Sequence, residues 1–257
     1  MPRLSERLKL TSGQRLPPSL EPLSRLIRGL MVGRIFTYWA DGVATAHYCP
    51  FSDDPEFEAS HQTMARGWIP GADVRWRMWL LTSLAQQCEH LPGNFAEFGT
   101  WRGGCAYMIL DRTDVAPGHR FFLFDTFAGI PGDRLTAGER DKEFAGQLSN
   151  TSVGYVDKLL ARWRPRYELC PGDVFQTLGD VDVGALSFAH IDMNASAPSK
   201  RALEYAYAAM VPGGIIAFDD YGWASCEEQR VMIDAFFADL LERPIALPTG
   251  QAFVIKR

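Results

Sequence analysis

The stretch that decides the fold is Phe95-Ala-Glu-Phe-Gly-Thr-Trp-Arg-Gly-Gly104, a short apolar strand that runs into a glycine-rich turn. Glycine adopts backbone angles that are closed to other residues, and it lets a ligand approach the chain closely. We predict a helix over 103–112 after this turn, and a helix N-terminus favours an anionic group such as a carboxylate. The spacing differs from the G-x-G-x-x-G of dinucleotide-binding proteins. Taken alone, the glycines fit an ordinary strand-to-helix turn equally well.

From this turn to the end of the chain, short apolar runs alternate with helical stretches, a pattern typical of a parallel α/β sheet. The strands that we predict are Phe95–Gly99, Arg120–Asp125, Tyr167–Cys170, Ala185–Asp192, Gly214–Asp219, Pro244–Leu247 and Ala252–Lys256. The further helices that we predict lie near 152–163, 198–210 and 226–241. No helix separates the last two strands. We therefore expect a doubly wound, seven-stranded, mostly parallel α/β sheet with an antiparallel last strand, and one long polar loop over 132–150.

We expect three segments: a polar arm over 1–22, a helical cover over 23–92 and a cofactor-binding domain over 93–257. The clearest helix of the cover runs over 72–88, because its apolar residues recur on one face. We expect the cover and the polar loop to form the pocket for the reacting partner molecule. The many aromatic residues of the cover are also compatible with a homodimer.

Composition excludes several classes of protein. The chain has 257 residues, 47% of them hydrophobic and 22% charged, which is ordinary for a soluble globular protein. Lys and Arg total 26 against 31 Asp and Glu, so the basic surplus typical of nucleic-acid binding is absent. We find no signal-peptide core and no run of about 20 apolar residues. The scattered cysteines form no C-x-x-C pair and suit a reducing compartment, so we expect a cytoplasmic enzyme without nucleic-acid or membrane partners.

Acidic residues lie near the ends of the first three predicted strands, where a doubly wound sheet binds its ligands. Glu97, two positions before Gly99, suits a cofactor's amino group. Asp125, followed by Thr126, is placed to accept hydrogen bonds from two ribose hydroxyls, and Asp173 suits the amino group of an adenine. A helix N-cap is the plainer interpretation of Asp125, and a turn residue that of Asp173. Together with the glycine turn, these residues predict a site for a nucleoside-containing cofactor.

Three further carboxylates, Asp192, Asp219 and Asp220, lie at the ends of the fourth and fifth predicted strands. Adjacent parallel strands are about 4.8 Å apart, so these side chains can converge on one small volume. Like charges that close raise one another's pKa unless a cation neutralises them, and carboxylate oxygens suit Mg²⁺. Capping of a loop is the plainer interpretation of the Asp219-Asp220 pair. Strand alternation is expected to point His190 away from Asp192, and we interpret this histidine as a core residue.

These residues resemble the class I S-adenosylmethionine-dependent methyltransferases. Within that class they are similar to the macrocin O-methyltransferase family, which includes macrolide-sugar and aminocoumarin-sugar methyltransferases. The matching segments are Gly93–Gly104, Phe124–Pro131, His190–Asp192, Val211–Gly222 and Leu247–Gln251. The resemblance is good over 93–257 and weak over the cover.

The resemblance implies S-adenosylmethionine at the ends of the first three strands, and a divalent ion, usually Mg²⁺, that binds the acceptor hydroxyls. The cofactor-binding residues that we predict are Glu97, Gly99, Thr100, Gly103, Asp125, Thr126, Asp173 and Asp192. The metal ligands that we predict are Asp192, Asp219 and Asp220. Asp192 is also the predicted catalytic residue, the base that takes the proton from the hydroxyl. The implied acceptor is a small molecule with vicinal hydroxyls, a sugar on a natural product or a polysaccharide.

One segment departs from the family pattern. Many members read D-x-D-L-Y-x-S-T where this chain reads Asp192-Met-Asn-Ala-Ser-Ala-Pro-Ser199. Asn194 keeps an oxygen but lacks a charge, which leaves the identity of the acceptor open. Two alternative functions also stay open. One is an NAD-dependent oxidoreductase, because Asp125 also suits that cofactor's ribose, and the other is an inactive methyltransferase-like binding protein.

Overall fold

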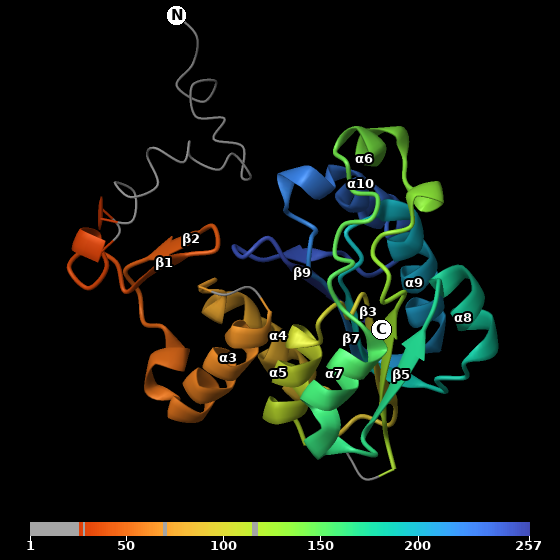
Figure 1. Ribbon diagram of the computed structural model, residues 1–257, viewed down its shortest axis with the longest axis horizontal. Coiled ribbons are helices and arrows are strands. Elements are labelled where there is room, and N and C mark those ends of the chain that lie inside the picture. The colour runs from red at the N-terminus through yellow and green to blue at the C-terminus, as the bar shows by residue number, and fades with distance from the viewer. Residues whose placement is uncertain (1–25, 28, 69–70, 115–117) are drawn as a thin grey trace, which may run out of the picture.

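A computed structural model describes residues 26–27, 29–68, 71–114 and 118–257, so the predicted arm over 1–22 lies outside the described residues. A seven-stranded sheet with the order β5-β4-β3-β6-β7-β9-β8 forms the centre of the structure (Figure 1). The strands are β3 (Asn94–Phe98), β4 (Phe121–Asp125), β5 (Tyr167–Pro171), β6 (Leu186–Ile191), β7 (Met210–Phe218), β8 (Ile245–Ala246) and β9 (Ala252–Ile255). Strands β3 to β7 are parallel, whereas β9 pairs antiparallel with both β7 and β8. The predicted doubly wound α/β fold is confirmed.

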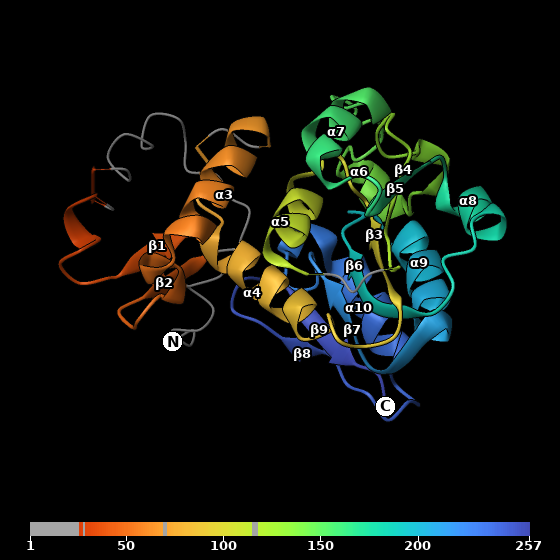
Figure 2. The same cartoon turned by 90° about the horizontal axis from the view of Figure 1, so that it is seen from below.

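Helices cover both faces of this sheet. The helices labelled in Figure 1 are α3 (Pro55–Gly67), α4 (Arg75–Gln86), α5 (Gly104–Arg112), α6 (Ala137–Asp141), α7 (Val153–Leu160), α8 (Val174–Asp180), α9 (Ser196–Ala209) and α10 (Glu227–Phe236). Side chains alternate along β3, so that Phe95 packs in the core with α4 and α5 while Phe98 packs in the core with α9. Figure 2 shows α4 and α5 on one side of the sheet and α9 on the other. Among the helices in the described part of the chain, none is long and apolar enough to span a membrane.

The strand order reverses between β3 and β6, which are neighbours in the sheet although two strands separate them in the sequence. Ligands of doubly wound sheets bind beyond the carboxyl ends of the strands at such a reversal. Strand β3 ends at Phe98 and β6 ends at Ile191, so Gly99 and Asp192 are the first residues beyond those ends. The sheet thus places the glycine turn beside the first of the three predicted metal ligands.

The cover is only partly helical, in contrast to the expectation for 23–92. A two-stranded antiparallel hairpin, β1 (Tyr38–Ala40) and β2 (Val43–Thr45), precedes α3. Its turn residues Asp41 and Gly42 have φ angles of 47° and 76°. A two-residue turn with two positive φ angles matches the twist of the strands, and Asp-Gly is its typical sequence. The Asp41-Gly42 pair is therefore a local indication of the hairpin in the sequence, although the periodicity of the surrounding segment indicates helices.

Two more elements differ from the expectations. The stretch 132–150 holds a 3-10 turn and α6, where we expected one polar loop. Thr136 and Glu139 form a capping box at α6, and the Glu139 carboxylate also accepts the N–H of Ser196 at the start of α9, at 2.6 Å. Helix α8 was not expected, because 7 residues are too few to show helical periodicity.

Candidate active site

The glycine turn after β3 packs directly against the end of β6. Gly99 has a φ of 92°, and a Cβ at this position would lie 1.9 Å from the carbonyl oxygen of Asp192. The Asp192 N–H donates to the carbonyl of Phe98 at 2.8 Å, which holds the two segments together. Gly103, with a φ of 74°, is the N-cap of α5. Glycine at position 99 is therefore required by the close approach of β6, whatever ligand binds beside it.

A cavity, which we call the donor cavity, opens beside this turn. The predicted cofactor-binding residues that line it are Gly99, Asp125, Thr126, Asp173 and Asp192. Thr100 lines a second cavity described below, whereas Glu97 and Gly103 line neither of the two. Glu97 nevertheless keeps one buried carboxylate oxygen, Oε2, without a hydrogen-bond partner in the described part of the chain.

Asp125 organises both loops at the mouth of the donor cavity. Its Oδ2 accepts the N–H of Trp101 at 2.7 Å, and its Oδ1 accepts the N–H of Phe127 at 2.6 Å. Burial raises the pKa of Asp125, and the backbone donors act against that rise. Each carboxylate oxygen retains a further lone pair, so Asp125 can shape the two turns and also accept from a ligand hydroxyl.

Asp173 serves as the N-cap of α8, where its carboxylate accepts the N–H of Phe175 at 3.0 Å. The same carboxylate pairs with Arg134 Nε at 3.1 Å, and the Arg134 guanidinium lies over the Phe175 ring. The plainer interpretation of Asp173 as a capping residue thus describes its contacts. Its position in the wall of the donor cavity leaves the adenine role as a proposal.

The expected orientation of His190 is wrong, whereas its full burial agrees with the interpretation as a core residue. Side chains two positions apart along extended backbone lie on the same face, so alternation directs His190 and Asp192 to one face rather than to opposite faces. His190 is fully buried, its Nδ1 lies 3.0 Å from Glu97 Oε1, and its Nε2 lies 3.6 Å from Asp219 Oδ1. Burial alone would lower the pKa of His190, but hydrogen bonding to Asp219 and Glu97 and their charges raise it to about 10. His190 therefore lies between the cofactor-side glutamate and the carboxylate cluster, in contact with both.

The three aspartates converge as predicted, with one carboxylate oxygen from each lying within 4.8 Å of the others. Nothing in the described part of the chain donates a hydrogen bond to the carboxylate of Asp192. Burial, followed by the charges of Asp219 and Asp220, raises the pKa of Asp192 well above its usual range. A carboxylate without donors beside two others is neutralised either by a proton or by a cation, and its hard oxygen donors would suit Mg²⁺.

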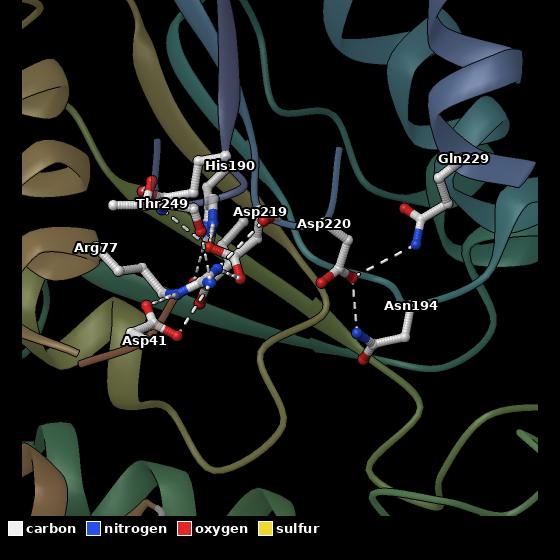
Figure 3. A network of polar contacts seen from close by, with 10 residues as sticks. Asp41, Arg77, His190, Asn194, Asp219, Asp220, Gln229 and Thr249 are labelled. Carbon is white, nitrogen blue, oxygen red and sulfur yellow. Dashed lines mark hydrogen bonds and ion pairs between the residues drawn. The ribbon is translucent and has the colours of Figure 1, made fainter. Parts of the chain in front are cut away.

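Asp219 is held in place by donors on both of its oxygens (Figure 3). Arg77 Nη1 donates to Oδ2 at 2.5 Å, and Gln251 Nε2 donates to Oδ1 at 2.9 Å. Burial raises the pKa of Asp219, but the Arg77 cation and His190 more than reverse that effect and hold it below its usual range. Arg77 was missed from the sequence. The sequence does indicate this residue in one way: Arg77 is a single charged residue on the apolar face of the helix predicted over 72–88, four positions before Leu81.

Asp220 is supported by two amides instead of cations. Its Oδ2 accepts from Asn194 Nδ2 at 2.7 Å and from Gln229 Nε2 at 3.4 Å (Figure 3). Burial and then the charge of Asp219 raise the pKa of Asp220 to about 6. The departure at Asn194 therefore supplies a neutral donor to Asp220, where an aspartate would add another negative charge.

A second, open cavity of about 1230 Å³, which we call the acceptor cavity, adjoins the donor cavity. Both are lined by Gly99, Trp101, Asp192 and Asn194, so they meet at the carboxylate cluster. The aromatic residues in the wall of the acceptor cavity are Trp68, Trp101, Phe144 and Trp223. The cover contributes through Asp41, Trp68, Ala72, Val74 and Arg77.

A family model for macrocin O-methyltransferases matches residues 61–241. The chain belongs to the macrocin O-methyltransferase family. The resemblance noted from the motifs is thereby confirmed, and membership makes the chain an S-adenosylmethionine-dependent O-methyltransferase. Neither the oxidoreductase nor the inactive binding protein is favoured by this result.

A curated relative is similar to this chain in sequence, and two solved structures are similar to it in fold. The 8-demethyl-8-(2,3-dimethoxy-alpha-L-rhamnosyl)-tetracenomycin-C 4'-O-methyltransferase of Streptomyces olivaceus is 25% identical over 194 residues, 69% of this chain and 74% of that protein. The structure of the O-methyltransferase NovP has a TM-score of 0.65 at 21% identity, over 78% of this methyltransferase and 88% of NovP. Apo CalS11, a TDP-rhamnose 3'-O-methyltransferase of calicheamicin biosynthesis, has a TM-score of 0.52 at 19% identity, over 81% and 96% of the two chains.

Proposed function

We propose that this methyltransferase transfers the methyl group of S-adenosylmethionine to a sugar hydroxyl, assisted by a divalent cation held by Asp192, Asp219 and Asp220. The observation that carries the proposal is the convergence of these carboxylates where the donor and acceptor cavities meet. Asp192 lacks any donor within the described residues, so its charge is available to the ligands. The homodimer and the cytoplasmic location expected from the sequence stay predictions.

The donor cavity would hold the cofactor by groups already described. Asp125 would accept from the ribose hydroxyls, and Asp173 would lie near the adenine. The unpartnered Glu97 Oε2, beside Thr100, fits the cofactor's amino group, because an ammonium group there would satisfy a buried acceptor. With the cofactor anchored at both ends, its methyl group would face the acceptor cavity.

The chain's own residues would then align the acceptor and take up its proton. Methyl transfer is an in-line displacement, so holding the hydroxyl in line with the sulfonium contributes much of the rate. A bound cation would lower the pKa of a coordinated hydroxyl. Asp192 would accept the hydroxyl proton, because it lines both cavities where they meet.

The acceptor cavity fits a neutral glycoside better than an anionic one. Arg77 is the only cationic residue among those that line it in the described part of the chain, and all of its N–H groups are already bonded. Among the residues that line it, the cavity therefore offers no free cationic side chain for a diphosphate. Trp68 and Trp101 meet edge to face, with ring centroids 6.2 Å apart, and present an apolar wall for a sugar face or an aryl aglycone.

We therefore expect an aryl α-L-rhamnoside to be methylated with a kcat/KM about tenfold or more above that of TDP-rhamnose, the substrate named for CalS11. The measurement is initial-rate methyl transfer from radiolabelled S-adenosylmethionine to each acceptor at equal concentration. A preference for the nucleotide sugar would contradict the neutral-acceptor assignment. Absence of methyl transfer to any sugar in a panel of glycosides, polyols and catechols would contradict the sugar assignment itself.

A further inference from the structure

Arg77 joins three segments that are far apart in the sequence. It is 2% exposed and lies in the first turn of α4. Its Nε and Nη2 donate to the carboxylate of Asp41, at 2.9 and 3.5 Å. Its Nη1 donates to the Asp219 carboxylate at 2.5 Å and to the Asp219 carbonyl at 3.2 Å, and Nη2 also donates to the carbonyl of Thr249 at 3.0 Å. Figure 3 shows the guanidinium between Asp41 and Asp219.

These contacts use every N–H of the guanidinium, which has five. Arg77 therefore has no donor left for a substrate, although it lines the acceptor cavity. We propose that Arg77, paired with Asp41, is a positioning residue that orients the Asp219 carboxylate for binding of the divalent cation. This inference rests on the proposed function, because it needs Asp219 to be a metal ligand.

The geometry around Asp219 supports this role. Arg77 fixes Oδ2, and Gln251 fixes Oδ1, so the carboxylate cannot rotate without breaking a buried hydrogen bond. The lone pairs that remain can face Asp192 and Asp220, whose oxygens lie within 4.8 Å. Residues that hydrogen-bond to a metal ligand set its orientation, and their loss typically costs about 10- to 100-fold in metal affinity or activity.

Asp41 explains how a cation can stand this close to a metal site. A guanidinium alone would repel a divalent ion over a few ångströms of protein interior. Asp41 neutralises that charge on the opposite side of the guanidinium, so the pair is neutral as a unit while its N–H groups still hold Asp219. The Asp41-Gly42 turn of the β1–β2 hairpin places this carboxylate beside Arg77, and the side chain of Asp41 is only 8% exposed.

If Arg77 orients Asp219, removing its guanidinium should weaken Mn²⁺ binding, whereas if Arg77 mainly repels the cation, removing it should strengthen Mn²⁺ binding. The two roles therefore predict opposite results. The probe is Mn²⁺, whose dissociation constant is measured by electron paramagnetic resonance of the free ion, without substrates. We expect Arg77→Lys, which keeps the charge but loses the planar fork, and Arg77→Met to weaken Mn²⁺ binding by about tenfold or more. Asp41→Asn leaves the guanidinium charge unbalanced and is expected to weaken binding by about tenfold.

The matched control is Arg75→Met, because Arg75 lies on the same helix, pairs with Asp73 and lines neither the donor nor the acceptor cavity. It should bind Mn²⁺ as the wild type does, and all variants should keep the wild-type affinity for S-adenosylmethionine. Raising the Mn²⁺ concentration should restore turnover in Arg77→Lys and Asp41→Asn, which a merely structural defect would not allow.

Two outcomes would overturn the positioning role. One is Mn²⁺ binding by the Arg77 variants that is as tight as, or tighter than, that of the wild type. The other, decisive where the Arg77 variants fail to fold, is an unchanged Mn²⁺ affinity in Asp41→Asn. Failure of the proposed function looks different, because then the wild-type protein itself would not bind Mn²⁺.

Discussion

The Asp192→Asn variant is expected to lose about a thousandfold in kcat while its affinity for S-adenosylmethionine stays near the wild-type value. The amide keeps the size of the side chain but can neither accept the hydroxyl proton nor supply a charge to the cation. Steady-state methyl transfer and calorimetric titration with S-adenosylmethionine in the absence of acceptor measure the two quantities. Asp239→Asn, at an exposed position, is the matched control and should behave as the wild type. Wild-type kcat in Asp192→Asn would remove Asp192 from the mechanism.

The same substitution, which lowers the activity, is expected not to lower the stability of the cation-free protein. Burial and the neighbouring carboxylates raise the pKa of Asp192, so its ionised form destabilises the cation-free fold at neutral pH. The amide removes this cost, and we expect the Tm of cation-free Asp192→Asn to equal or exceed that of the wild type. As the pH falls below the raised pKa, the wild-type carboxyl takes up a proton and the difference should shrink, and it should vanish only below the carboxyl pKa of the unfolded chain, about 4. A variant that loses activity because it is unstable would instead show a lower Tm.

The Asp125→Ala variant is expected to bind S-adenosylhomocysteine about a hundredfold more weakly, because two hydrogen bonds from ribose hydroxyls to a carboxylate are lost. Part of the loss in affinity is expected to come from distortion of the two loops at the mouth of the cavity, since Asp125 also accepts hydrogen bonds from the backbone N–H groups of Trp101 and Phe127. Asp125→Asn keeps an acceptor for one of these donors and should lie between the alanine variant and the wild type.

Asp133→Ala provides the control for Asp125, because Asp133 follows the same strand but is exposed. Its dissociation constant for S-adenosylhomocysteine should match that of the wild type in calorimetric titration. If Asp125→Ala also bound with wild-type affinity, the donor cavity would not be the ribose site.

Much of the site could be predicted because one physical rule locates it. The carboxyl ends of parallel strands meet at one edge of the sheet, so the sequence alone predicts that Gly99, Asp125 and Asp192 lie together. The same rule brought Asp219 and Asp220 to Asp192, as the structure shows. These positions follow from strand order alone and need no knowledge of side-chain partners.

The contacts that support the carboxylates could not be predicted in this way. Arg77 lies 142 positions before Asp219, and no periodic pattern links a single buried arginine to a partner so distant. Asp41 reaches the site because the Asp-Gly turn closes a hairpin inside a segment whose aromatic residues suggested helices. Arg77 and Asp41 depend on tertiary contacts that local propensity does not encode. The orientation of His190 is a different case, because side chains two positions apart along extended backbone lie on the same face.

Whether the three aspartates bind a catalytic divalent cation is tested most directly by methyl transfer to an aryl glycoside after treatment of the protein with EDTA and its removal. We predict turnover at background, full recovery on addition of Mg²⁺, and an unchanged affinity for S-adenosylhomocysteine in both states. Wild-type turnover by the metal-free protein, without added Mg²⁺, would contradict the assignment of Asp192, Asp219 and Asp220 as ligands of a catalytic cation.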